Sequence, residues 1–187
     1  MAERRPHILF VSTDIVGPEM AGPGIRAWEL AHALAAHSPV TLAAPDSATP
    51  PPSPTVRFFP YRFGQAGALV SALAEADVVV GQGFAFAHHA ELLASDLPLA
   101  IDLYDPLIIE GLDLYASADL PAAEAQHAQY QALTEAQLRR GDFFFCATEA
   151  QRDYWLGALT GVGRINLGVA RAADRALRDL IDLVPSG

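Results

Sequence analysis

The sequence predicts a three-layer α/β fold, in which helices cover both faces of a doubly wound, mostly parallel sheet. Short apolar runs rich in strand-forming residues recur along the chain, and segments with helical periodicity alternate with them. The 187 residues are 51% hydrophobic and 18% charged, so the chain can form a sizeable core and is not intrinsically disordered. One domain over residues 1–187 is therefore expected.

The first 45 residues predict a β-loop-α-β unit. Ile8–Val11 is a short apolar run typical of a buried strand. A helix is expected from about Ile25 to His37, because four apolar residues follow the i, i+3, i+4, i+7 spacing, namely Ala27, Leu30, Ala31 and Leu34. Pro39 ends this helix, and Val40–Ala44 follows as the second strand.

The rest of the chain continues the alternation of strands and helices. Further strands are expected at Val56–Phe59, Val78–Val80, Leu99–Leu103 and Phe143–Cys146. Helices are expected at Gln65–Ala76, Phe84–Ala94, Pro121–Arg140, from the Thr148/Gln151 capping box to Leu159, and at Arg171–Leu183. Two stretches, 45–54 and 106–119, are expected to be irregular. Alternation of this kind favours a parallel sheet with right-handed crossovers.

The charged residues exclude several classes of function. The net charge is −10, and all twelve basic residues are arginines. Binding to a nucleic-acid backbone is not expected, because phosphate affinity comes from clustered cations. Without lysine, the chain cannot contain a Walker phosphate loop, a Schiff-base lysine or a lysine general base.

The single cysteine, Cys146, lies in an apolar run and is expected to be a buried strand thiol. One cysteine can form neither an intramolecular disulfide nor a multi-cysteine metal site. The apolar stretch His7–Val11 is too short for the core of a signal peptide, and no run approaches the roughly 20 residues of a membrane span. We therefore expect a cytoplasmic protein without a transmembrane segment.

In a doubly wound sheet, ligands bind beyond the carboxyl ends of the strands, so the residues just after each strand are the candidates. They are Asp14, Gly22, Gly24 and Arg26 after the first strand, Gln82 and Gly83 after the fourth, Tyr104 and Asp105 after the fifth, and Glu149 after the sixth. We expect these loops to converge on one crevice.

The residues from Gly22 to Ala27 match the dinucleotide-binding pattern G-x-G-x-x-[GA], and Asp46 follows the second strand. However, ten residues separate Val11 from Gly22, whereas that fingerprint places its first glycine directly after the strand. Glycines before a helix N-terminus still allow backbone amides to approach an anion. The alternative is a glycine-rich connection that binds no ligand.

A metal site is not expected. Asp102 and Asp105 are close in sequence, but Asp102 lies within a strand and the spacing matches no loop-type cation site. His88, His89 and His127 lie on expected helices without a partner at metal-ligand spacing, so core or surface roles are expected.

Four blocks of the sequence resemble a known family. Ile8–Ser12, Met20–Ala31, Ile101–Pro106 and Arg140–Leu156 together are similar to the amino-terminal half of a retaining GT-B glycosyltransferase of the glycosyltransferase 4 type. The resemblance covers essentially the whole chain. It implies one Rossmann-like half of a GT-B fold.

The resemblance also implies roles for the candidate residues. In that family the active site lies between two Rossmann-like domains, of which the carboxyl-terminal one holds most of the nucleotide sugar and the amino-terminal one holds the acceptor. Gly22 and Gly24 match the loop that approaches the donor diphosphate and the acceptor. Arg26 is either the cation beside that loop or an ordinary surface arginine. Tyr104 stands where many members have a histidine, and a phenol cannot replace an imidazole in acid-base chemistry.

Asp14 and Asp105 are expected to bind acceptor hydroxyls or to fix their loops, and the alternative is that they are ordinary turn or capping residues. The resemblance implies no cofactor and no metal, since the nucleotide sugar is a substrate. The implied partners are a sugar or polyhydroxyl acceptor and the carboxyl-terminal donor-binding domain of the same enzyme.

The expected function is that of the acceptor-side domain of a glycosyltransferase. The family's carboxyl-terminal arginine-lysine pair has no counterpart, and the residues Asp182–Gly187 resemble the crossover into a second domain. The chain alone is therefore expected to have no transferase activity. Two alternatives stay open: an NAD(P)-binding oxidoreductase domain, and a non-catalytic α/β binding module.

Overall fold

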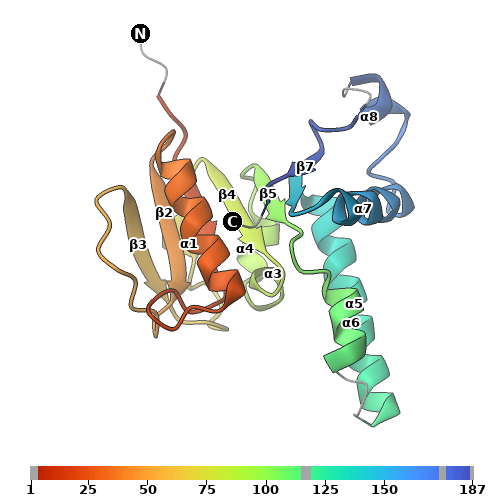
Figure 1. Ribbon diagram of the computed structural model, residues 1–187, viewed down its shortest axis with the longest axis horizontal. Helices are drawn as coiled ribbons and strands as arrows, with labels where there is room; N and C mark the ends of the chain where they lie inside the picture. The colour runs from red at the N-terminus through yellow and green to blue at the C-terminus, as the bar shows by residue number, and fades with distance from the viewer. Residues whose placement is uncertain (1–3, 115–118, 173–175, 186–187) are drawn as a thin grey trace. The chain divides into compact units, whose positions relative to one another are not determined.

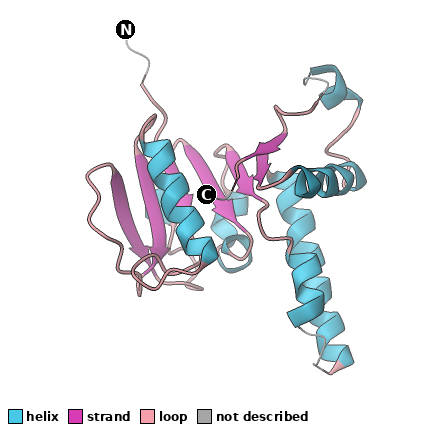
Figure 2. Ribbon diagram, in the orientation of Figure 1, coloured by secondary structure: helices cyan, strands magenta, loops and turns pink. Residues whose placement is uncertain are grey.

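A computed structural model describes residues 4–114, 119–172 and 176–185. Its strands are β1 (Ile8–Val11), β2 (Val40–Pro45), β3 (Val56–Tyr61), β4 (Val78–Gln82), β5 (Leu99–Asp102), β6 (Phe143–Cys146) and β7 (Ile181–Leu183). They form a seven-stranded parallel sheet in the order β3-β2-β1-β4-β5-β6-β7 (Figures 1 and 2). This confirms the predicted α/β class with its doubly wound parallel sheet.

The helices are α1 (Gly22–Ala35), α2 (Val70–Leu73), α3 (Ala85–His88), α4 (Ala90–Ala94), α5 (Leu107–Leu114), α6 (Leu120–Arg140), α7 (Glu149–Gly161) and α8 (Leu167–Ala172). The chain divides into two compact units, Met1–Ala100 with Ser186–Gly187 and Ile101–Pro185. No helix among the described residues is both long and apolar enough to cross a membrane.

In the first unit, β1 lies between β2 and β4 and is parallel to both. Ile8 is opposite Val40 on one side and Val78 on the other. Every residue of β1 and β2 is buried, as expected for parallel strands covered on both faces. Helix α1 lies across one face of these strands (Figure 1). The edge strand β3 is buried at its end residues Val56 and Tyr61 and is partly or fully exposed between them, where an exposed proline, Pro60, discourages further pairing.

In the second unit, β6 pairs in parallel with β7, and Phe144 is opposite Ile181. Helices α5 and α6 lie side by side (Figure 1), and a Cβ on Gly111 of α5 would lie 2.7 Å from the Tyr130 ring of α6. Gly141, the C-cap residue of α6, has an extended conformation with φ −59° and ψ 140°. A glycine is required there for close packing, since a Cβ would lie 2.5 Å from the Phe144 ring.

Helix α1 begins three residues earlier than predicted, so Gly22 and Gly24 lie in its first turn. Pro23 fits there because the first helical residues need no N–H donor. Two predicted helices are also wrong in extent. Gln65–Ala76 is reduced to α2, since Gly64 and Gly67 adopt left-handed turns with φ of 74° and 75°.

Phe84–Ala94 is split into α3 and α4 at His89, whose φ of −131° and ψ of 76° are not helical. The stretch 106–119, predicted to be irregular, contains α5, which packs on α6. Residues 115–118 of that stretch lie outside the described chain.

The predicted helix Arg171–Leu183 is wrong. Helix α8 ends at Ala172, residues 173–175 lie outside the described chain, and the last part is strand β7. Backbone bonds on both sides of the β7 segment attach it to β6: the Phe144 N–H donates to the Leu180 carbonyl at 2.9 Å, and the Val184 N–H donates to the Cys146 carbonyl at 2.8 Å. Pairing with a distant strand therefore outweighs the local helical pattern.

Candidate functional site

Asp14 anchors the loop between β1 and α1. Its Oδ1 accepts the Ile15 N–H at 2.8 Å, and its Oδ2 accepts the Gly24 N–H at 3.2 Å. The Ser12 hydroxyl accepts the Asp14 N–H at 3.2 Å and donates to the Asp14 carbonyl at 3.0 Å. The structure thus brings two predicted site residues, Asp14 and Gly24, into direct contact.

The first turn of α1 is therefore already occupied by a carboxylate. The N-cap residue Ala21 has no capping side chain, and Asp14 supplies the cap from the preceding loop. Pro23 has no N–H, so the Gly22 N–H is the only amide of this turn left without a partner in the described structure. An anion approaching this helix end would meet the negative charge of Asp14.

Gly24 is also required for packing. A Cβ at this position would lie 2.5 Å from the Ile15 carbonyl oxygen and 3.3 Å from Asp14 Oδ2. The close approach of α1 to its own loop therefore accounts for this glycine without any ligand. Arg26, two residues further on, is only 6% exposed and is therefore a buried rather than a surface arginine.

Gln82 and Gly83 lie beside this loop. Val11 of β1 is opposite Gly81 of β4, so the residues that follow the two strands are neighbours at the carboxyl edge of the sheet. Gln82 is half-buried at the end of β4, and Gly83 has a φ of 42°, a left-handed conformation that glycine adopts without strain.

In the second unit, the Tyr104 backbone is held by side chains from two elements. Asp102 Oδ1 accepts the Tyr104 N–H at 3.1 Å, and Gln151 Nε2 donates to the Tyr104 carbonyl at 2.9 Å. Trp155 Nε1 donates to the preceding carbonyl, that of Leu103, at 2.9 Å. The half-buried side chains of Tyr104 and its neighbour Asp105 thus extend from a rigid segment.

Gln151 is the site residue whose importance the sequence understated. The capping box is present, since Thr148 Oγ1 accepts the Gln151 N–H at 3.2 Å. In addition, Gln151 Oε1 accepts the Ala147 N–H at 2.8 Å while its Nε2 reaches Tyr104. The capping-box spacing was the available signal, but the contact with Tyr104 depends on the tertiary fold.

Glu149 does not contact the Tyr104 segment through any described bond. Its Oε1 lies 2.6 Å from Arg178 Nη2, and Arg178 Nη1 lies 2.5 Å from Asp182 Oδ1. Hydrogen bonds to Glu149 and Asp182 raise the pKa of Arg178, and the Arg178 guanidinium lowers the pKa of Asp182. A substrate would have to compete with this ion pair for Glu149.

The remaining titratable residues that the sequence singled out include Cys146, Asp102 and His127. Cys146 is a buried free thiol, as predicted, and burial raises its pKa. Asp102 is 3% exposed, and the described residues contain no group of three or more His, Cys, Asp or Glu side chains placed to hold a metal. His127 is half-buried, and its Nε2 lies 3.3 Å from Gln131 Nε2.

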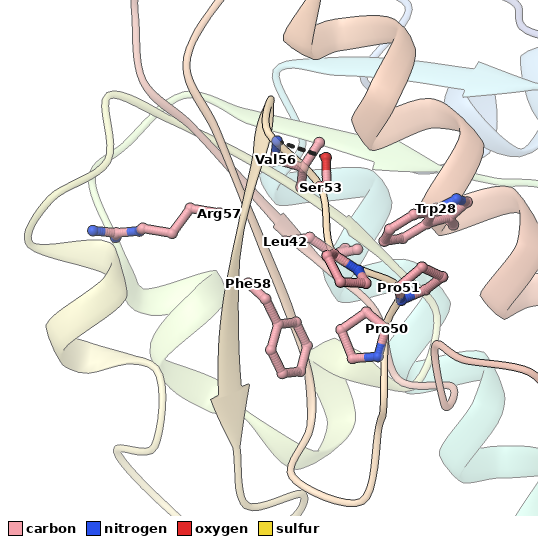
Figure 3. A pocket seen from close by; sticks show the side chains of 9 residues that line it. Trp28, Leu42, Pro50, Pro51, Ser53, Val56, Arg57 and Phe58 are labelled. Carbon is pink, nitrogen blue, oxygen red and sulfur yellow. Dashed lines mark hydrogen bonds between the residues drawn. The ribbon is translucent and has the colours of Figure 1, made fainter.

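One cavity lies away from the carboxyl ends of the strands. It has a volume of about 400 Å³ and is lined by Trp28 of α1, Leu42 of β2, Val56, Arg57 and Phe58 of β3, and the loop residues Pro50, Pro51, Pro52 and Ser53. Figure 3 shows Trp28, Phe58, Pro50 and Pro51 around the cavity, while the Arg57 side chain points away. None of the predicted site residues lines it.

Comparisons with known proteins bear on the fold. No family model matches the sequence, and no curated protein matches it. A solved structure of sucrose-phosphate synthase from Thermosynechococcus elongatus aligns with 98% of this chain at a TM-score of 0.61 and 17% identity. The aligned part is 48% of that protein, so this chain spans about half its length.

A second solved structure is a wide-type short-chain dehydrogenase/reductase from Veillonella parvula in complex with NADP. Its alignment covers 77% of this chain and 70% of that protein, at a TM-score of 0.45 and 15% identity. The likeness to the synthase, at 17% identity, shows a shared fold.

Proposed function

We propose that this chain is the amino-terminal, acceptor-side domain of a glycosyltransferase that moves a sugar from a nucleotide-sugar donor to a hydroxyl acceptor, with retention and without a metal. The observation that carries the proposal is the alignment of nearly the whole chain with about half of a sucrose-phosphate synthase. The four sequence blocks that resemble the glycosyltransferase 4 type support it independently.

The charge of the chain supports a division of labour between two domains. Sugar transfer develops negative charge on the departing diphosphate, so the active site needs preorganised cations and amides. This chain is lysine-free with a net charge of −10, and Asp14 already occupies the N-terminus of α1. In the proposal, a carboxyl-terminal domain of the same enzyme supplies the cations that hold the diphosphate.

The residues of the first unit would serve the acceptor. Each Asp14 carboxylate oxygen accepts one backbone N–H and has a further lone pair for a sugar hydroxyl. The unpartnered Gly22 N–H would approach the substrate, Gln82 and Gly83 border the same edge, and Arg26 would contribute its charge from a buried position.

The residues of the second unit would lie near the transferred sugar. The Tyr104 hydroxyl can donate to and accept from a sugar hydroxyl, although it cannot shuttle a proton as an imidazole does. Asp105 would orient the same hydroxyls, with Glu149 as a further contact if the ion pair with Arg178 opens. Gln151 holds the Tyr104 backbone in place. This supports the role, because sugar transfer depends on the orientation of the reacting groups.

The test is to express the natural reading frame beyond Gly187 together with this chain. The longer protein is incubated with a panel of nucleoside diphosphate hexoses and sugar acceptors, and release of the nucleoside diphosphate is measured. We expect acceptor-dependent release from the longer protein and none from the 187-residue chain. Transfer by the short chain, or a reading frame without a second α/β domain, would refute the proposal.

A dinucleotide-binding oxidoreductase domain is the second candidate, favoured by the G-x-G-x-x-[GA] match at Gly22. The ten residues between β1 and α1, and the Asp14 carboxylate on the Gly24 amide, weigh against a diphosphate there. Titration with NADH and NADPH, followed by nicotinamide fluorescence, separates the two. A chain that binds neither cofactor nor sugar, even with the following domain attached, would be a non-catalytic α/β module.

A further inference from the structure

A cluster of four rings lies in the first unit, and none of its residues belongs to the candidate site. The aromatic cluster consists of Tyr61 at the end of β3, Phe63 two residues later, His88 at the end of α3, and His89 between α3 and α4. The centroid of the Phe63 ring lies 4.5 Å from that of His88 and 5.8 Å from that of His89. The Tyr61 and His89 rings meet edge to face at 4.9 Å.

The cluster has a buried layer and an exposed layer. Tyr61 and His89 are 3% and 0% exposed, whereas Phe63 is 40% exposed and His88 is also exposed. A single exposed apolar ring is common on protein surfaces, so the informative feature is its fixed packing against a second exposed ring. Here two buried rings support an exposed pair that is held in a defined tilt of 48°.

His89 holds the backbone that carries Phe63. Its Nε2 accepts the Gly64 N–H at 3.3 Å, so the neutral imidazole carries its proton on Nδ1. That Nδ1 is buried without a hydrogen-bond partner in the described structure and lies 3.5 Å from Glu91 Oε1. Glu91 Oε1 also accepts the Leu69 N–H at 3.3 Å, so His89 and Glu91 secure both ends of the turn segment 64–69.

The aromatic cluster is connected to the candidate acceptor loop. The Tyr61 hydroxyl donates to the Ser12 carbonyl at 2.7 Å, and burial raises the pKa of this phenol, which keeps it a donor. Ser12 in turn bonds Asp14 through its side chain. β1 and β3 are both parallel to β2, so Phe63 and Asp14 follow strands that end at the same edge of the sheet.

The chemistry of this surface suits an uncharged, hydroxyl-rich ring. Aromatic faces pack against the C–H faces of such a ligand, and imidazole nitrogens and a carboxylate bind its hydroxyls. Anions are disfavoured, since Asp14 is negative and the nearby Arg62 guanidinium lies 3.8 Å from the Asp46 carboxylate. We propose that Phe63 and His88 form a stacking subsite for a neutral sugar ring of the acceptor, and that His89 is the residue that positions it.

This inference rests on the proposed function for the identity of the ligand, but its test needs no transfer reaction. Amide and aromatic NMR spectra of the chain are recorded during titration with glucose, fructose and sucrose, and with glucose 6-phosphate and fructose 6-phosphate. We expect at least one neutral sugar to shift the Gly64 amide and the Phe63 and His88 ring signals. We also expect the phosphorylated sugars to bind more weakly than their neutral counterparts.

Variants at Phe63 test the stacking. Phe63→Ala should weaken sugar binding about tenfold, and Phe63→Trp should retain it. The matched control is Val70→Ala, which truncates another apolar side chain that is 56% exposed in the same unit and should leave the affinity unchanged. If no neutral sugar shifts these signals, or if Phe63→Ala binds as tightly as the parent, the subsite does not exist.

Variants at His89 test the positioning. His89→Gln keeps an acceptor near the position of Nε2 and should bind the sugar within about twofold of the parent. His89→Phe keeps a ring but removes the acceptor, so it should shift the Gly64 amide in the unliganded chain and weaken binding as Phe63→Ala does. Equal binding by both variants would refute the positioning role, and unchanged spectra outside residues 61–91 would show that both fold normally.

The outcomes separate this inference from the proposed function. If the longer protein transfers sugar and Phe63→Ala leaves its acceptor KM unchanged, the subsite is wrong and the glycosyltransferase proposal stands. If the chain binds neutral sugars through Phe63 but the longer protein transfers none, the subsite stands and the proposed reaction fails.

Discussion

Gly24 allows a sharp test of how α1 packs on its loop. In an open helix, replacing glycine by alanine stabilises a protein by up to about 1 kcal/mol, because alanine loses less backbone entropy on folding. At Gly24 the added Cβ would lie 2.5 Å from the Ile15 carbonyl oxygen, a backbone atom that cannot rotate away. Overpacking of this kind costs about 1–3 kcal/mol.

The same substitution would also displace the Asp14 carboxylate. Its Oδ2 would lie 3.3 Å from the new Cβ and accepts the Gly24 N–H, a bond of about 1 kcal/mol. We therefore expect Gly24→Ala to destabilise the chain by a net amount of about 2 kcal/mol, which corresponds to a fall in Tm of about 4–8 °C for a protein of this size.

Gly157 is the matched control. It lies within α7, is exposed, and a Cβ there would meet no atom within 4 Å. Gly157→Ala should stabilise the chain by about 0.5–1 kcal/mol. Thermal unfolding followed by circular dichroism at neutral pH gives both values. A Gly24→Ala protein as stable as the parent would refute the packing argument, since the two substitutions are expected to have opposite signs.

Three further predictions follow from buried and paired groups. Trp155→Phe removes an indole N–H from a buried backbone carbonyl and should lower the free energy of unfolding by about 1–3 kcal/mol, measured in urea. The His7 N–H and the Arg4 guanidinium lower the pKa of Asp77. Its stabilising effect is therefore present above the unfolded pKa of about 4 and is lost as the pH falls through the lower folded value, so acid unfolding should depend less on pH in Asp77→Asn. Cys146 should react with a thiol reagent at mildly alkaline pH much more slowly in the folded chain than in urea, and equal rates would contradict its burial.

The candidate site could be predicted in part. The sequence places the residues after β1, β4, β5 and β6 at strand ends, because parallel strands in an α/β fold carry their functional loops there. It could not show that Asp14 caps α1, that Arg26 is buried, or that Glu149 is paired with Arg178. Each of these depends on atoms brought together from residues distant in the sequence. Whether all the loops converge on one crevice stays a prediction.

The sequence by itself determined the α/β class, the centres of six strands and the helices α6 and α7. These elements are encoded by apolar runs, helical periodicity and caps within a few residues of one another, so local free energies suffice. Only the tertiary structure decided that Ile181–Leu183 is a strand, that α5 forms on α6, and that the helix predicted at Phe84–Ala94 is interrupted at His89. In these segments the local pattern favours another conformation or none, and bonds or packing with distant residues outweigh it.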